Sequence, residues 1–138
     1  MQYLLDTNVC IALINRRPVS VRARCQDALA GGDTLTVSSI VIFELRYGAA
    51  KSTRQEANSE RLAVFLGGPV EVLAFDDGDQ RAAGEIRAAW ESAGTLIGAY
   101  DVLIAGQAVH RGATLVTANA GEFGRVRGLA WTDWGIAI

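Results

Sequence analysis

The sequence predicts an α/β fold of three layers, α/β/α, with helices on both faces of a central parallel sheet of four to five strands. Short apolar stretches alternate with longer helical stretches along the whole chain, which is typical of strands joined by crossover helices. No internal repeat, linker or low-complexity segment interrupts this alternation. The chain has 138 residues, of which 50% are hydrophobic. We therefore expect a single domain over residues 1–138 with one core.

The composition also excludes several classes of protein. Charged residues interrupt every apolar run before it reaches the length of a membrane span, so we expect no membrane protein. Asp6 falls where a signal peptide needs its apolar region, and the cytoplasm is the expected location. Cys10 and Cys25 lie in apolar helical patterns and are predicted to be small buried hydrophobes rather than a disulfide. The net charge of −2 is not that of a strongly basic nucleic-acid binder, although local arginine patches matter more than the sum.

The first half of the chain predicts two strands and four helices. Helix starts are marked by Thr, Asn, Ser or Pro, and helix ends by Gly pairs or by Pro, because these residues cap or interrupt helices. The expected strands are Tyr3–Leu5 and Leu35–Val37. The expected helices are Val9–Ile14, Val19–Ala30, Ile40–Ala50 capped by Ser38 or Ser39, and Arg54–Leu66 started by Ser52 or Thr53.

The second half predicts three more strands and two long helices. Val70–Phe75 and Ala113–Thr117 are the expected third and fourth strands, and a short fifth strand is expected around Ala130–Trp131. Asp76 is the expected cap of a helix to about Ala93. After a loop, 94–98, a further helix covers Ala99–Arg111 and is closed by Gly112.

Three carboxylates do not fit a plain core. Asp6 directly follows the first strand, where parallel sheets bind ligands, although it could instead only cap the next helix. Glu44 lies in a helix that is apolar on nearly every side, so it needs a metal, a raised pKa or a cationic partner near Arg46 or on another helix. Asp101 heads the core-facing stripe of its helix, although a carboxylate in a first turn is also favoured by the helix dipole.

Polar side chains recur after the fourth strand, at Thr117, Asn119 and Glu122. These residues either shape a turn or join Asp6, Glu44 and Asp101 at one mouth of the sheet. Ligands that are all oxygen suit Mg²⁺ or Mn²⁺ and not zinc. Such clusters hold metals that act on phosphodiesters.

Four stretches of the chain resemble the PIN-domain ribonuclease toxins of the VapC group, from bacterial type II toxin–antitoxin pairs. The stretches stand in the order of that family and cover the chain from end to end. They are Tyr3–Asn8, Phe43–Ala49, Ile97–Ala105, and Leu115–Asn119 with Glu122-Phe123, Arg125-Val126 and Gly128-Leu129.

The resemblance implies Mg²⁺- or Mn²⁺-dependent cleavage of RNA, often a structured RNA such as tRNA. It implies that Asp6 and Asp101 are metal ligands, that Glu44 is a ligand directly or through water, and that Thr7 orients water or Asp6. The implied partner is a small VapB-like antitoxin whose tail blocks the acidic pocket, commonly with an arginine. Homodimers are also implied.

The chain departs from many PIN domains at Asn119, where they carry an aspartate. Close relatives within the toxin group share the asparagine with a glutamate nearby. We expect Glu122 to supply part of the missing charge and Asn119 to hold water or Asp6. In the alternative, Glu122 faces solvent and Asn119 only shapes the turn.

Other functions fit the residues less well. A haloacid-dehalogenase-type phosphatase needs a second aspartate where Asn8 stands, and a dinucleotide-binding domain needs a glycine-rich turn after the first strand. His110, the only histidine, ends a helix, where the dipole favours it structurally, so a Ser-His-Asp triad is not indicated. The second hypothesis is an inactive PIN-like module that only binds RNA or a partner. The tryptophans, Tyr47 and Tyr100 belong either to base stacking or to core and dimer contacts.

Overall fold

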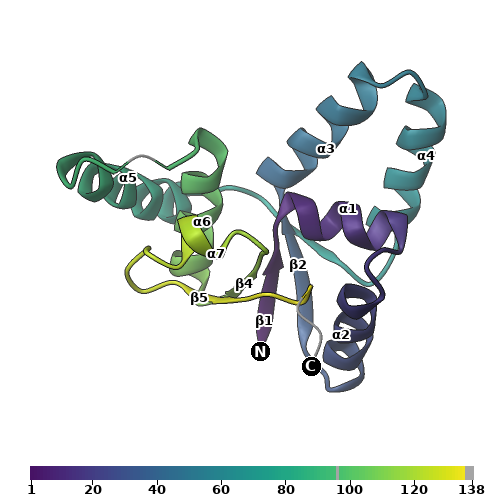
Figure 1. The fold of residues 1–138 in the computed structure, drawn as a ribbon, viewed down its shortest axis with the longest axis horizontal. Helices are drawn as coiled ribbons and strands as arrows, with labels where there is room; N and C mark the ends of the chain where they lie inside the picture. The colour runs from purple at the N-terminus through teal and green to yellow at the C-terminus, as the bar shows by residue number, and fades with distance from the viewer. Residues whose placement is uncertain (96, 136–138) are drawn as a thin grey trace.

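The computed structural model describes residues 1–95 and 97–135 and contains one parallel five-stranded sheet (Figure 1). The strand order is β3-β2-β1-β4-β5, so the first strand is central. The strands are β1 (Gln2–Leu5), β2 (Thr34–Ser38), β3 (Glu71–Leu73), β4 (Thr114–Val116) and β5 (Ala130–Thr132). Residue 96 of the predicted loop 94–98 and residues 136–138 at the end of the chain lie outside the described residues.

Helices lie on both faces of this sheet, which confirms the predicted fold class. The chain moves from β1 to β2 and β3 on one side, then crosses to β4 and β5 on the other. The first four helices therefore group away from α5 and α6 (Figure 1). The helices are α1 (Thr7–Asn15), α2 (Val19–Ala30), α3 (Ser39–Lys51), α4 (Gln55–Leu66), α5 (Asp77–Ser92), α6 (Ala99–Arg111) and α7 (Ala120–Phe123). Within the described residues, no helix combines the length and the apolar character needed to cross a membrane.

Most predicted helix ends are confirmed by the caps. The Ser38 hydroxyl accepts a hydrogen bond from the Ile40 N–H, and Asp76 caps α5 in a reciprocal pair with Asp79. Gly112 ends α6 with φ of +63°, a conformation that glycine adopts without strain. These interactions are all local in sequence, which is why sequence patterns predict them.

Three local predictions are wrong. Ser52 does not start α4; its hydroxyl donates to the Ala49 carbonyl and ends α3 instead. The third strand is three residues long rather than six, and β3 is an edge strand that pairs only with β2. The turn expected after β4 contains the short helix α7.

The topology places a crevice at the carboxyl ends of β1 and β4. Successive connections leave these two neighbouring strands in opposite directions, and such switch points open a ligand crevice in α/β sheets. Both strands are buried, with Leu4, Leu5, Leu115 and Val116 at 0% exposure. The chain after each strand is therefore held on a rigid base.

Candidate active site

Asp6 lies at the switch point, one residue beyond β1. Its side chain is 7% exposed, and its Oδ1 accepts a hydrogen bond from the Val9 N–H at 2.9 Å. Asp6 therefore caps α1, which was one of the two roles that the sequence predicted for it. Burial raises the pKa of Asp6, which hydrogen bonds from the Thr117 hydroxyl and the backbone N–H groups of Val9 and Asn8 oppose. The hydrogen bond from Val9 uses only one of the two carboxylate oxygens, so Asp6 can also bind a ligand.

Glu44 projects from α3 toward the start of α1. Its Oε1 accepts a hydrogen bond from the Thr7 hydroxyl at 3.0 Å. Thr7 therefore orients Glu44, whereas the resemblance implied that it orients water or Asp6. The predicted cationic partner near Arg46 is absent among the ion pairs of residues 1–95 and 97–135. Glu44 is partly buried rather than fully buried, which lowers the cost of leaving it without a cation.

Asp101 lies in the first turn of α6 and faces the other carboxylates. Burial, a side-chain hydrogen bond with Glu122 and the negative charges of Glu122, Glu44 and Asp6 together raise the pKa of Asp101 to about 7. Carboxyl groups that share a site cannot all ionise without mutual repulsion. Asp101 Oδ2 and Glu122 Oε1 both lie close to Gly98, and the charges of Glu44 and Asp6 are near enough to act on Asp101.

Glu122 is held in this region by two further hydrogen bonds. Its Oε1 accepts from the Gly98 N–H at 2.6 Å, and its Oε2 accepts from the Asn119 amide at 2.7 Å. Glu122 thus links α7 to the segment that starts α6. The asparagine was expected to hold water or Asp6, whereas its amide contacts Glu122 and the Thr117 hydroxyl contacts Asp6.

The structure adds one carboxylate that the sequence reasoning missed. Asp133 directly follows β5 at the same edge of the sheet, and its negative charge adds to the raised pKa of Asp6. The missed signal was the same one that identified Asp6 and Asn119, namely a polar residue just after a strand. The fifth strand is so short that the sequence pattern did not predict where it ends.

A second acidic group lies elsewhere and has a different chemistry. Asp76, Asp79 and His110 offer ligand atoms within 4.8 Å of one another, the only such group of His, Cys, Asp or Glu in the described part of the chain. Asp79 is fully buried, and Arg111 Nε and Nη2 each lie 3.1 Å from one of its oxygens. Further contacts with His110, the Asp76 N–H and Gln107 use the remaining lone pairs. This cluster already contains its cation and acts as a structural clamp between α5 and α6.

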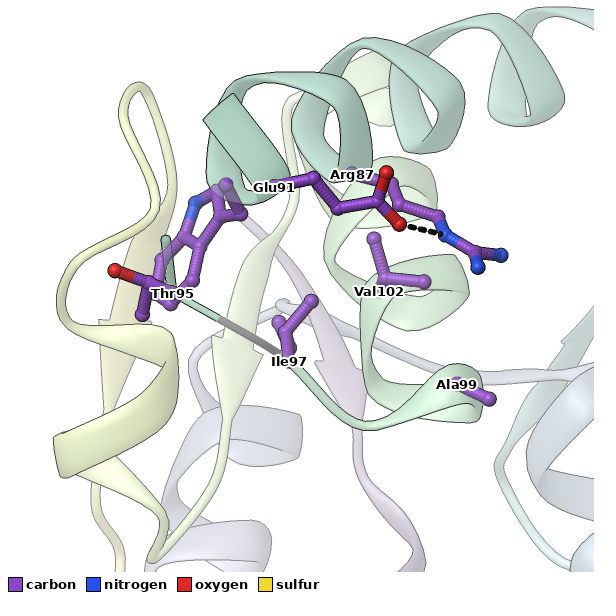
Figure 2. A pocket seen from close by; sticks show the side chains of 7 residues that line it. Arg87, Glu91, Thr95, Ile97, Ala99 and Val102 are labelled. Atoms are coloured by element: carbon purple, nitrogen blue, oxygen red, sulfur yellow. Dashed lines mark hydrogen bonds and ion pairs between the residues drawn. The ribbon is translucent and has the colours of Figure 1, made fainter. Parts of the chain in front are cut away.

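One hollow borders the carboxylate region, and another lies apart from it. One, of about 220 Å³, is lined by Thr7, Glu44 and mainly apolar parts of α1, α3 and α4, with Arg61 among them. The other, of about 150 Å³, lies between α5 and the start of α6 (Figure 2). Figure 2 shows Ile97 and Val102 in this second hollow beside the Arg87–Glu91 ion pair, whose Nε–Oε1 distance is 3.0 Å. Neither Asp6 nor Asp101 lines it, so it is separate from the acidic centre.

Comparisons with known proteins identify the family of this chain. Residues 3–129 match the family model described as the PIN domain. The chain belongs to the PIN domain family. It is 40% identical over 134 residues to Ribonuclease VapC2 of Rickettsia felis and to the tRNA(fMet)-specific endonuclease VapC of Shigella flexneri, covering 97% of this chain and 98% of each relative.

A solved structure gives the same result for the fold of this PIN domain. The crystal structure of VapBC2 from Rickettsia felis bound to a promoter DNA fragment superposes with a TM-score of 0.91 at 39% identity. The match covers 97% of this chain and 99% of that one. The resemblance to VapC proteins stated from the four sequence stretches is therefore confirmed.

Proposed function

We propose that this PIN domain is a VapC-type endoribonuclease toxin that cleaves RNA at the edge of the sheet where Asp6, Glu44, Asp101 and Glu122 lie. The observation that carries the proposal is the convergence of these carboxylates at the switch point without a bound cation from the protein. Among the described residues, no Lys, Arg or His forms an ion pair with any of them. This contrasts with Asp79, which Arg111 neutralises.

The residues fit a divalent metal ion. All the donor atoms are oxygens, and burial together with neighbouring negative charges raises the pKa of Asp6 and of Asp101. No three of these carboxylates have ligand atoms within 4.8 Å of one another. Mg²⁺ is usually held by one or two carboxylates and keeps several waters, so it does not require three closely spaced carboxylates. When bound, the ion supplies positive charge that offsets the carboxylates and the scissile phosphate.

The protein's own residues then have distinct roles. Asp6 and Asp101 hold the ion, and Glu44 contributes directly or through water, with Thr7 fixing its rotamer. Glu122 adds negative charge and positions Asp101, while Asn119 and the Gly98 N–H hold Glu122 in place. Such supporting hydrogen bonds orient metal ligands and commonly change activity by about 10–100-fold when removed.

The relatives suggest the substrate and the partner. The printed name of the Shigella flexneri protein makes tRNA(fMet) the first substrate to test. The Rickettsia felis structure contains a VapB antitoxin, and we infer a VapB-like partner here. The hollow beside Glu44 offers apolar walls to a peptide, and the uncompensated carboxylates attract an arginine in bidentate geometry. We further infer a homodimer that acts in the cytoplasm, where its RNA substrates are.

A cleavage assay with matched variants tests the proposal. The purified chain is expected to cut RNA in Mg²⁺ or Mn²⁺ and to stop in EDTA, and Asp6→Asn or Asp101→Asn is expected to abolish cutting without unfolding the chain. Glu71→Gln is the control, because Glu71 is exposed on the edge strand β3, two strands away from β1. Full activity in EDTA would exclude the metal mechanism, and a folded parent without any activity would favour a module that only binds.

Addition of the antitoxin tests the toxin assignment separately. Expression of the chain alone is expected to arrest growth, and co-expression with the VapB-like partner is expected to restore it. Normal growth while the cell contains chain that is active in the cleavage assay would contradict this assignment.

A further inference from the structure

Two aromatic rings contact each other beside the carboxylates and remain exposed. Phe43 and Tyr100 are 51% and 46% exposed, and their ring centroids lie 5.7 Å apart. Phe43 directly precedes Glu44 on α3, and Tyr100 directly precedes Asp101 on α6. The two helices that carry proposed metal ligands therefore also present one aromatic surface where they meet.

The surface continues along α3. Phe43, Tyr47 and Lys51 are spaced four residues apart and so lie on one face of the helix. Tyr47 is 59% exposed, and Lys51 Nζ lies 4.9 Å from the centroid of its ring. At a rise of about 1.5 Å per residue, this stripe is roughly 12 Å long. That length matches about three stacked nucleotides at about 3.4 Å each.

The charges along the stripe complement a nucleic acid strand. The carboxylates at one end repel phosphates, so an RNA strand that reaches them needs compensating contacts nearby. Arg46 and Lys51 are exposed on α3, and Arg54 follows it. Exposed rings that accept bases next to cations that accept phosphates are the combination by which proteins bind single strands.

We propose that Phe43, Tyr47 and Tyr100 form a base-stacking platform for a single-stranded RNA segment next to the scissile phosphate. This inference deepens the proposed function and rests on it. The platform holds nucleotides next to the cut, and the scissile phosphate lies at the end of the platform where the carboxylates are. Lys51 binds a phosphate at the far end of the platform.

Kinetics on a short single-stranded oligoribonucleotide test the platform. Tyr47→Ala and Tyr100→Ala are each expected to raise KM by about 5–100-fold with kcat nearly unchanged, because base–aromatic stacking is lost before the chemical step. Tyr47→Phe and Tyr100→Phe keep the ring and are expected to retain the parent KM. Val64→Ala is the control, because Val64 is 78% exposed on α4, away from the platform. An unchanged KM in both alanine variants would overturn the inference.

Photocrosslinking provides a test that does not need cleavage. An oligouridine that carries 4-thiouridine is bound to the Asp101→Asn variant, irradiated, and mapped by mass spectrometry. Crosslinks at Phe43, Tyr47 or Tyr100 support the platform, even if the parent chain cleaves no RNA and the proposed function fails. Crosslinks confined to other residues overturn it.

The oligomeric state distinguishes the platform from a contact between two copies of the chain. Sedimentation of the parent and of the Tyr47→Ala and Tyr100→Ala variants is expected to give the same mass. A dimeric parent that becomes monomeric in these variants would assign the aromatic surface to the subunit interface and overturn the inference.

Discussion

Glu122 of α7 and Asp101 of α6 are 21 positions apart in sequence but lie side by side at the carboxyl edge of the sheet, where both carboxyl groups come close to Gly98. Two carboxyl groups form a hydrogen bond only when one of them carries a proton, so their contact favours the protonated form of Asp101 and raises its pKa. The same two residues therefore set the pKa of Asp101 in the metal-free protein and belong to the proposed metal site. This makes Glu122 the residue whose replacement is most informative.

We expect Glu122→Gln to lower the cleavage rate by about 10–100-fold and to raise the Mg²⁺ concentration needed for half-maximal rate. The substitution removes a negative charge and weakens the link to Gly98 and Asn119. A second substitution, Asn119→Asp, is expected to restore part of the rate by returning the charge. The measurement is the initial rate across a Mg²⁺ titration. Parent rates for Glu122→Gln throughout that titration would leave the site with Asp6, Glu44 and Asp101 alone.

We expect Asp101→Asn to stabilise the metal-free protein while abolishing cleavage. The raised pKa means that ionised Asp101 opposes folding, and this cost grows as the pH rises from about 4 to about 7. The cost comes first from burying the charge and then from repulsion by the neighbouring carboxylates. Removing about 1 kcal/mol of it corresponds to a rise in Tm of roughly 3–6 °C for a chain of this size. Thermal melting in EDTA at pH 8 measures it, and the gain should shrink toward pH 4. A lower Tm for the variant at pH 8 would contradict the repulsion.

The clamp at Asp79 predicts a different pH dependence. Burial acts to raise the pKa of Asp79, but hydrogen bonds from Arg111, the Asp76 N–H and His110 outweigh it and lower the pKa to about 2. Because this value is below the ordinary 3.8, the stabilisation is complete above about pH 4 and is lost as the pH falls toward 2. Asp79→Asn should cost about 2–4 kcal/mol at pH 7, since it leaves Arg111 without its buried partner.

Asp77→Asn provides the matched control for this clamp. Asp77 lies on the same helix, and its Oδ2 lies 2.9 Å from Nη2 of Arg81 in an exposed ion pair. Its loss should change the free energy of unfolding by less than about 1 kcal/mol. Equal effects of the two variants in urea unfolding would contradict the assignment of the clamp.

The packing of α5 on α6 can be tested at two glycines. A methyl group at position 106 would lie 2.5 Å from the backbone nitrogen of Ala83, so Gly106→Ala should lower the free energy of unfolding by about 1–3 kcal/mol. Position 84 of α5 has no atom within 4 Å of such a methyl group. Gly84→Ala should therefore raise that free energy by about 0.5–1 kcal/mol through helix propensity. Urea unfolding of both variants measures the difference, and a stabilised Gly106→Ala would show that the helices are not in close contact there.

The sequence by itself determined the features that depend on neighbours along the chain. Ser38, Asp76 and Gly112 end or begin helices through groups only two to four residues away, so their roles could be predicted. The order of strands and helices, and hence the parallel sheet, follows from the alternation of patterns. The polar residues after the first and fourth strands marked the correct edge of the sheet, and the four stretches that resemble VapC proteins identified the family.

Only the tertiary structure decided which distant groups meet. Ser52 could start one helix or end another, and packing assigned its hydroxyl to the Ala49 carbonyl. Nothing near Asp79 in sequence predicts that Arg111 neutralises it. Nothing near Asp101 predicts that Glu122 adds a negative charge beside it and raises its pKa. Both are carboxylates in helical first turns, and both suit a local cap. Whether such a carboxylate is neutralised or stays without a cation depends on the charges that the fold brings next to it. Those charges come from residues far away in sequence, so a local sequence pattern cannot predict them.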